Sequence, residues 1–318
     1  MICTDVNSTV KPPIACVTGA TGMIGRRIVS RLLMLGYQVR VLTRNSYDNQ
    51  QVCVFKASLT DKVALDSFIN GADYVFHCAA ELLDESKMWQ VNVNGTEQIT
   101  ALVQKYRIKY YCFLSSAGVI GRTSVKLVDE STPCNPQNRY EETKLEAEKL
   151  ALKRIEGCNT VILRPTNVVD FEHLGDLGLP IEGSIVSRLK AFIKGSECSH
   201  IVHAEDVADA AIFFLDRAPS PTPRIFFVSI DDDPLNTVSE LWELYRERVS
   251  GRKGSIPTKF SHLPIVVPYV LRFLVGKPGN SGLVKYSSKL LTYEGFVYSF
   301  GVRKTVEQIF LARNTEKV

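Results

Sequence analysis

The chain has 318 residues, of which 45% are hydrophobic, so it is long enough for one large domain or two unequal ones with a substantial core. Its formal net charge is only +4 and its basic residues are dispersed, which argues against nucleic-acid binding. None of its eight cysteines forms a CxxC pair. We therefore expect reduced, mostly buried thiols and a cytoplasmic location.

Apolar runs of strand length alternate with helix-length segments as far as residue 166. This alternation is typical of βαβ units and predicts an α/β fold, a Rossmann-type doubly wound parallel sheet. Ligands bind such sheets beyond the carboxyl ends of the strands. The predicted strands are Ile14–Val17, Gln38–Leu42, Val52–Phe55, Tyr74–Cys78, Tyr110–Leu114 and Thr160–Leu163, and the predicted helices are Met23–Leu35, Lys62–Asn70, Met88–Tyr106 and Arg139–Ile155.

The alternation breaks after Pro165. We assign 12–166 to a dinucleotide-binding domain, to which 204–230 returns with a helix and a strand. Residues 167–203, with a helix at Ile185–Lys194, and 231–318 form a smaller substrate-binding lobe. The apolar stretch Leu263–Gly276 is too short to span a bilayer. We expect a buried helix there, and contact with a membrane surface is the less favoured alternative.

A glycine-rich turn, TGATGMIG, follows the first predicted strand and opens the first predicted helix. Gly19 permits a tight turn, Gly22 lets the backbone approach a pyrophosphate, and Gly25 lets the helix pack against the sheet. The N–H groups at the start of the helix then face the phosphates. This strand–turn–helix context predicts a dinucleotide site.

Arg44 follows the second predicted strand, where an acidic residue would hold the ribose hydroxyls of NAD. A guanidinium can instead bind the 2′-phosphate of NADP by bidentate contacts. NADP(H) is therefore favoured over NAD(H). The alternative is an arginine that is merely solvated at a strand end.

Tyr140 and Lys144 are four residues apart on a predicted helix and project from the same face. A nearby ammonium favours the phenolate form of a tyrosine, so the pair is suited to acid–base chemistry. Ser116 follows a predicted strand and can hydrogen-bond a substrate oxygen. Asn92 lies early in a helix and can hold a kink and a water, or act as a simple cap.

Seven motifs occur in the order found in extended short-chain dehydrogenases/reductases of the NAD-dependent epimerase/dehydratase type. They are TGATGMIG, VFHCAAE, NVNGT, FLSSAGVIG, YEETK, LRPTNVV and VHAEDVADA. The sequence resembles this family over roughly residues 12–230. The resemblance makes Tyr140 the acid/base, Lys144 its activator, Ser116 the orienting hydroxyl and Asn92 the relay residue. It implies a cofactor site made by Gly19, Thr21, Gly22, Met23, Ile24, Gly25, Thr43, Arg44, Ser58, Leu59, Cys78, Ala79, Ala80, Ser115, Tyr140, Lys144, Pro165 and Thr166.

The substrate prediction depends on finer resemblances. The LRPTNV motif is most similar to bacterial nucleotide-sugar epimerases and reductases. However, this chain has Ser199-His200-Ile201 just before the VHAEDVA segment, where those enzymes usually carry an arginine, and Ile120 replaces their usual tyrosine. A less polar carbonyl substrate, as in hydroxysteroid or flavonoid reductases, therefore remains open. A non-catalytic NADP(H)-sensing protein is a third alternative.

The remaining expectations concern partners and metals. The helices Met88–Tyr106 and Arg139–Ile155 pair across a two-fold axis in many enzymes of this resemblance, which predicts a homodimer. The histidines lack metal-ligand spacing, so we expect no metal. We expect the acidic run Asp231–Asp233 to form a solvated turn.

Overall fold

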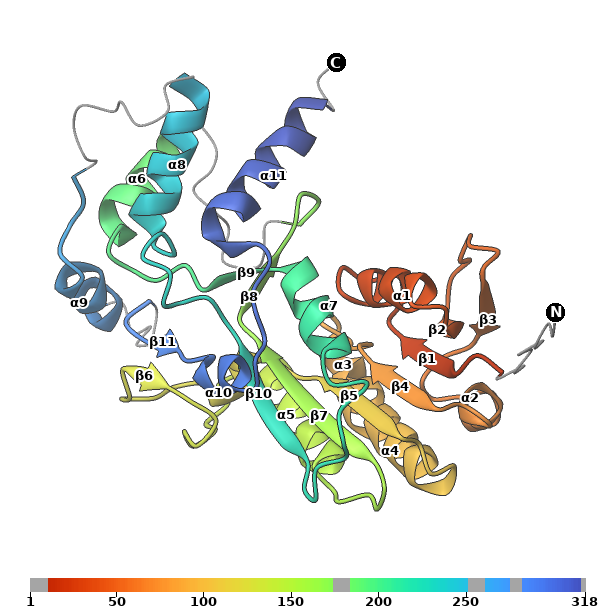
Figure 1. Ribbon diagram of the computed structural model, residues 1–318. Coiled ribbons are helices and arrows are strands. Elements are labelled where there is room, and N and C mark those ends of the chain that lie inside the picture. The colour runs from red at the N-terminus through yellow and green to blue at the C-terminus, as the bar shows by residue number, and fades with distance from the viewer. Residues whose placement is uncertain (1–10, 174–183, 251–260, 275–281, 316–318) are drawn as a thin grey trace.

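The computed structural model describes residues 11–173, 184–250, 261–274 and 282–315 (Figure 1). Its centre is a seven-stranded, wholly parallel sheet in the order β10-β7-β5-β4-β1-β2-β3. This confirms the predicted Rossmann-type α/β fold. The strands are β1 (Ile14–Thr18), β2 (Gln38–Thr43), β3 (Val52–Lys56), β4 (Tyr74–His77), β5 (Tyr110–Leu114), β7 (Asn159–Pro165) and β10 (Arg224–Val228).

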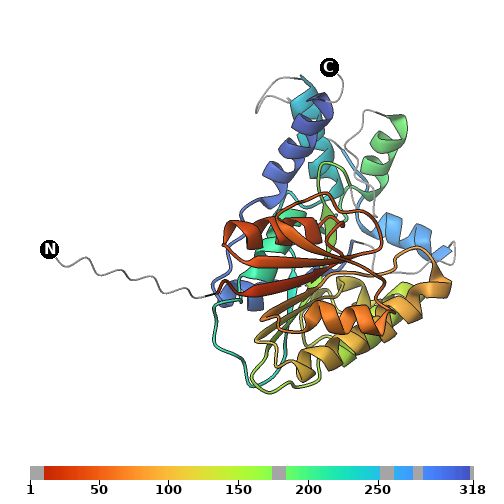
Figure 2. The same cartoon turned by 90° about the vertical axis from the view of Figure 1, so that its right-hand side faces the viewer.

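Helices cover both faces of the sheet, and successive residues of β1 serve the two faces in turn (Figure 2). Ala15 and Val17 pack on one face, and Ile14 and Cys16 on the other. This follows from the two-residue period of a strand. The first face carries α1 (Gly25–Met34) and α7 (Ala204–Ile212), and the second carries α2 (Lys62–Ile69), α4 (Gly95–Lys105) and α5 (Arg139–Ala151).

The helix predicted over Met88–Tyr106 is divided. It comprises part of α3 (Glu85–Met88), a π-helical segment η1 (Trp89–Asn94) and α4. A π-helical turn shifts the register of the helix and is frequent at functional sites. Apolar periodicity alone does not reveal it.

Most of the remaining elements form a C-terminal lobe beyond the carboxyl ends of the strands, whereas Leu291 and Phe296 near the C-terminus pack in the core of the sheet. The core of the lobe joins Val169, Ile201 and Leu241 to Val302 and Val306. The remaining elements are η2 (Ala117–Ile120), β6 (Leu127–Val128), β8 (Asn167–Val169), α6 (Ile185–Lys194), β9 (Ile201–His203), α8 (Val238–Ser250), α9 (Val266–Leu274), β11 (Lys285–Tyr286), α10 (Lys289–Tyr293) and α11 (Gly301–Thr315).

One expectation about burial was wrong. The helix α9 in the stretch Leu263–Gly276 is not fully buried, because Val266 and Leu274 expose 60% and 73% of their surface. Residues 275 and 276 lie outside the described part of the chain. Within the described residues, no helix is long and apolar enough to cross a membrane. The described cysteines are all free and mostly buried, as expected, although Cys53 is exposed.

Candidate active site

The glycine turn begins with a residue that no other amino acid can replace without strain. Gly19 has φ +69°, and a Cβ at this position would lie 2.7 Å from the backbone N of Ala79. The turn therefore packs directly on the segment that follows β4. The N–H of Gly22 closes it by donating to the carbonyl of Gly19 at 3.0 Å.

The structure changes the role expected for Gly25. A Cβ here would overlap the carbonyl oxygen of Gly19, so the residue packs against the turn itself rather than against the sheet. Ile24, at the N-cap of α1, has a side chain without an acceptor. An anionic ligand could take the place of a capping side chain. Thr21 and Gly22 are exposed beside it, and Met23 is half-buried.

A buried chain of hydrogen bonds links this turn to the π-helical segment. Thr18 Oγ1 lies 2.7 Å from His77 Nδ1, and Thr96 Oγ1 lies 3.0 Å from Nε2. Thr96 donates to the Asn92 carbonyl at 2.6 Å, so it accepts from Nε2–H and leaves Nδ1 to accept from Thr18. Burial, and secondarily the charge of Lys144, lowers the pKa of His77 to about 3. The imidazole is therefore a neutral structural link.

Lys144 is buried at the carboxyl end of β5. Its Nζ donates to the Leu114 carbonyl at 2.6 Å and lies 4.4 Å from the centroid of the Phe113 ring. Burial lowers the pKa of Lys144 to about 8, while the charge of Glu148 opposes that shift. Tyr140 lies one helical turn earlier on α5 and is half-buried. The helix thus presents a phenol and an ammonium at the edge of the sheet where the glycine turn lies.

Ser116 and the start of α5 meet at η2. The Ser116 hydroxyl caps η2 by accepting from the N–H of Gly118 at 3.1 Å, and its own proton is left to donate. A Cβ on Gly118 would lie 3.2 Å from Ser116 Oγ and 3.4 Å from Glu141 Cγ. Glu141 follows Tyr140, so the serine lies beside the first turn of the tyrosine's helix.

Asn92 clamps two segments together. Its Oδ1 accepts from Glu81 N at 2.7 Å, and its Nδ2 donates to Glu81 O at 3.0 Å and to Thr143 Oγ1 at 3.1 Å. Thr143 in turn donates to the Tyr140 carbonyl at 3.0 Å. Both amide protons are thus engaged by the protein. The geometry supports a residue that positions α5. Of the side-chain amide of Asn92, only the oxygen is left to bind a water.

Below the catalytic face lies a buried ion pair that sequence reasoning missed. Arg164 on β7 donates to Glu148 on α5, with distances of 2.5 and 3.0 Å, and Ser115 Oγ donates to the same carboxylate at 2.7 Å. Glu148 and Arg164 are 1% and 3% exposed. The carboxylate thus joins two strand ends to the helix that carries Lys144. The sequence did offer one signal for this ion pair, because Glu148 lies eight residues after Tyr140 on the same predicted helix.

The other predicted cofactor residues follow strand ends on the same edge. Arg44 is exposed after β2. The pKa of Glu81 is lowered by the N–H groups of Asp84 and Leu83, and further by the charge of Arg44. Thr43 and Ser115 are buried, as is Leu59, which lies against Gly95. Ser58 contacts Thr60 after β3, Cys78, Ala79 and Ala80 follow β4, and Pro165 and Thr166 lie at the end of β7.

On the lobe side, Asp231 is buried rather than part of a solvated turn, which corrects our expectation. It accepts from His200 Nδ1 at 2.6 Å and from the N–H of Tyr286 at 2.9 Å. His200 has φ +55°, and its ring packs edge-on against Tyr286. Burial, with the charges of Asp231 and Glu141, raises the pKa of Tyr286 to about 12. The effect of Glu141 indicates that Tyr286 lies near the start of α5.

The ligand atoms of Cys198, His200 and Asp231 lie within 4.8 Å of one another, a composition that could hold a cation. Nevertheless, the Asp231 carboxylate already bonds His200 and the backbone of Tyr286. The protein groups thus stabilise one another through these contacts.

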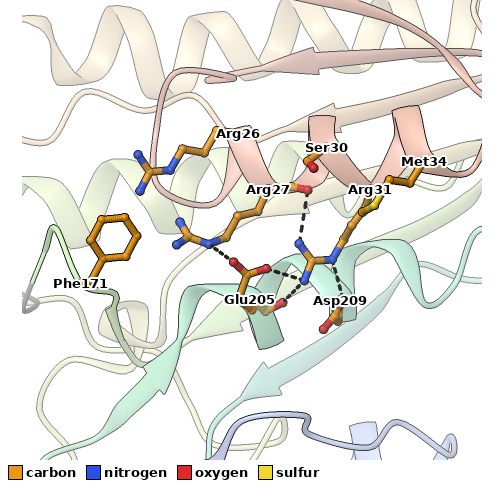
Figure 3. A pocket seen from close by; sticks show the side chains of 8 residues that line it. All are labelled: Arg26, Arg27, Ser30, Arg31, Met34, Phe171, Glu205 and Asp209. Carbon is orange, nitrogen blue, oxygen red and sulfur yellow. Dashed lines mark hydrogen bonds and ion pairs between the residues drawn. The ribbon is translucent and has the colours of Figure 1, made fainter. Parts of the chain in front are cut away.

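A hollow of about 630 Å³ between α1 and α7 is lined by arginines that are already paired (Figure 3). Arg27 bonds Asp170 at 2.9 Å, Glu205 at 2.7 Å and the Met23 carbonyl at 2.7 Å. Arg31 bonds Glu205 and Asp209. This network ties the glycine turn to the segment after β8, and its charges are compensated within the protein.

Residues 15–229 match the NAD dependent epimerase/dehydratase family. Cinnamoyl-CoA reductase 1 of Arabidopsis thaliana is 30% identical over 88% of this chain and 87% of its own length. A 4-hydroxy-2-methyl-3-oxo-4-farnesyl-3,4-dihydroquinoline-1-oxide ketoreductase of Stigmatella aurantiaca is 28% identical over 76% of this chain and 75% of its own.

The uncharacterized protein y4nG of Sinorhizobium fredii is 28% identical over 62% of this chain, and the match spans about half, 52%, of its own length. Among solved structures, the enzyme WbmG of Bordetella bronchiseptica in complex with NAD has a TM-score of 0.71 and 19% identity, covering 98% of this chain and 96% of that one. This likeness shows the shared fold.

Proposed function

The chain belongs to the NAD-dependent epimerase/dehydratase family, and on that premise we propose that it is an NADP(H)-dependent oxidoreductase with Tyr140 as its acid/base. When bound, the cofactor supplies hydride exchange with a C–OH or C=O carbon. The observation that carries the proposal is the common edge: the strained glycine turn and the Tyr140–Lys144 helix face both lie at the carboxyl ends of the strands.

Each of the residues at this edge would have a separate role. Gly19 and Gly22 leave room for a pyrophosphate at the start of α1, which fits a dinucleotide. Tyr140 would hold or release the proton of the substrate oxygen, and Ser116 would orient that oxygen with its free O–H. Lys144, fixed on the Leu114 carbonyl, keeps a positive charge beside the phenol. Asn92 and Glu148 hold α5 in register.

For the substrate, we propose a carbonyl or alcohol of low polarity. The residues after Ser116 pack into an apolar and aromatic cluster that includes Ala117, Ile120, Phe227 and Tyr286. Two relatives, the cinnamoyl-CoA reductase and the farnesyl-quinoline ketoreductase, have reductase names that fit this choice. The LRPTNV motif favours a nucleotide sugar as the second candidate.

The test compares wild type with Tyr140→Phe and Lys144→Met, at saturating NADPH for ketones and at saturating NADP⁺ or NAD⁺ for UDP-sugars, whose C–OH must first give up a hydride. Aromatic and aliphatic ketones and UDP-sugars are assayed by cofactor oxidation and by product analysis. Tyr140→Phe should lower kcat by about a hundredfold to ten-thousandfold, the usual value of a positioned proton-transfer group. Lys144→Met should also weaken NADPH binding, because the ammonium is lost from the cofactor edge.

Each result has a distinct meaning. Epimerised UDP-sugar with no net change in the oxidation state of the cofactor would select the second candidate. Near wild-type turnover by a folded Tyr140→Phe variant would refute the assigned acid/base. Cofactor binding without turnover of any substrate would support the non-catalytic NADP(H)-sensing alternative.

A further inference from the structure

The buried ion pair lies beside the lysine that the proposed reaction uses. Lys144 and Glu148 are four residues apart on α5, so their side chains share one face of the helix. Their exposed fractions are only 3% and 1%. The Leu114 carbonyl accepts from Lys144 Nζ at 2.6 Å. The next residue, Ser115, donates from Oγ to the Glu148 carboxylate at 2.7 Å. The ammonium and the carboxylate are therefore anchored on consecutive residues at the end of β5.

The positive charge of Lys144 is only marginally stable in this position. A buried ammonium loses its hydration and gives up its proton unless nearby groups favour the charged form. The Leu114 carbonyl and the face of the Phe113 ring, 4.4 Å from Nζ, favour it, but neither is an anion. Burial still lowers the pKa of Lys144 to about 8, even though the charge of Glu148 opposes the shift. Removing that charge would therefore leave much of the amine neutral near physiological pH.

Other titratable groups near Lys144 do not supply a negative charge at neutral pH. His77 on β4 is neutral, because burial, and secondarily the charge of Lys144, holds its pKa at about 3. Cys78 follows β4, and burial raises the pKa of its thiol to about 12 despite the charge of Lys144. Arg164 on β7 is a cation, and Tyr140 is the phenol on which Lys144 would act. Among the other elements packed on α5, η1 and η2 contain no ionisable side chain, and the charged residues of α3 and α4 are exposed.

Within the described residues around α5, Glu148 is therefore the anion that can act on Lys144. We propose that Glu148 is a positioning residue that holds Lys144 in its charged form. Its carboxylate is itself fixed, because Arg164 donates to both of its oxygens, at 2.5 and 3.0 Å, and Ser115 donates to one of them. The guanidinium offsets part of the negative charge, so the ion pair as a whole sets the field at the ammonium. The inference rests on the proposed function only in the role given to Lys144.

The two halves of the ion pair should move the titration of Lys144 in opposite directions. Glu148→Gln removes the anion and leaves Lys144 and Arg164 as two buried cations, so Lys144 should lose its proton at a lower pH. Arg164→Met leaves the carboxylate uncompensated, so Lys144 should keep its proton to a higher pH. A residue that merely held α5 in place would not reverse the sign of the effect between these two variants.

Carbon-13 NMR of the lysine Cε groups in the cofactor-free, full-length protein measures this titration, and Lys144→Met identifies the signal of Lys144. The midpoint in the wild type should lie at the pKa of about 8. It should lie about one pH unit lower in Glu148→Gln and about one pH unit higher in Arg164→Met. Glu146→Gln is the matched control, because this side chain on the same helix is 41% exposed and pairs with Lys149. Solvent screens its charge, so the midpoint should stay in place.

NADPH affinity, measured by fluorescence titration over the same pH range, tests the link to the proposed function. The affinity should fall as Lys144 loses its proton, and this fall should occur at a lower pH in Glu148→Gln than in the wild type. Circular dichroism verifies that each variant is folded. Should Glu148→Gln not fold, the upward displacement in Arg164→Met decides.

An unchanged midpoint in folded Glu148→Gln would overturn the proposal. So would displacements of the same sign in Glu148→Gln and Arg164→Met, or an equal displacement in Glu146→Gln. If the titration moves as expected but NADPH affinity does not follow it, the assignment of Glu148 stands, and the role given to Lys144 in the proposed function is wrong instead.

Discussion

At the edge of the sheet, Glu148 and Arg164 are buried charges paired with each other, whereas in the lobe Val186 and Leu189 are exposed apolar side chains. In the first region, burial of the charges carries a desolvation penalty, and the ion pair holds the polar groups in fixed positions. The second leaves apolar surface in water, which is unfavourable unless something covers it. The comparison teaches that this protein fixes buried polar groups in ion pairs at the sheet edge, whereas it leaves large apolar side chains exposed in the lobe.

Removing one partner of the buried pair should have the largest effect on stability. Arg164→Met leaves Glu148 buried without its guanidinium, and we expect a loss of roughly 3 kcal/mol in the free energy of unfolding. The loss is at the lower end for a buried pair, because Ser115 still donates to the carboxylate and the charge of Lys144 interacts with it. Urea denaturation measures this value.

The lobe supplies the matched control. Arg303 pairs with Glu247 at 3.1 Å, with side-chain exposures of 51% and 21%. Arg303→Met should change the unfolding free energy by about 0–1 kcal/mol, because solvent screens the pair. Equal losses in the two variants would contradict the contrast between the regions.

Acid should destabilise the protein partly through His77. Its folded pKa of about 3 lies below the ordinary 6.5, so the unfolded chain binds the proton first. The stabilisation is present above pH 6.5 and is lost as the pH falls toward 3. Between about pH 6.5 and about pH 5 we expect a loss of roughly 2 kcal/mol.

His203 tests whether this acid response belongs to the sheet edge. Burial, with the charge of Arg27, lowers the pKa of His203 to about 4, so its contribution is lost in the same direction but ends at a higher pH. Urea denaturation across this pH range should show a flatter dependence for His77→Gln, and a flattening above pH 4 alone for His203→Gln. An unchanged pH dependence in His77→Gln would show that the imidazole is not buried neutral.

Cofactor choice tests the sheet edge through binding affinity rather than through stability. Arg44→Ala should weaken NADPH binding by about 1.5–3 kcal/mol, the value of a hydrogen bond to a charged group, and leave NADH binding nearly unchanged. Fluorescence titration with both cofactors measures the difference. Equal affinities of the wild-type protein for NADPH and NADH would contradict the proposed preference.

The sequence by itself determined the parallel sheet, because short apolar runs separated by helix-length segments are typical of βαβ units, whose strands are buried on both faces. It also indicated the glycine turn, where only a residue without Cβ accepts φ +69° and the contact with Ala79. The four-residue spacing of Tyr140 and Lys144 shows equally that they share a helix face. Their catalytic roles remain predictions, as do the NADP(H) preference and the homodimer.

Tertiary structure decided which groups lie together. Glu148 meets Arg164, and His200 meets Asp231, because strands and helices far apart in the chain converge at one edge. The same holds for α6: its periodicity predicts a helix, but not that Ser187 and Ala191 face inward while Leu189 faces water. Which side chains of an element are buried depends on the segments that pack against it. The sequence of the element itself does not record which distant segments those are.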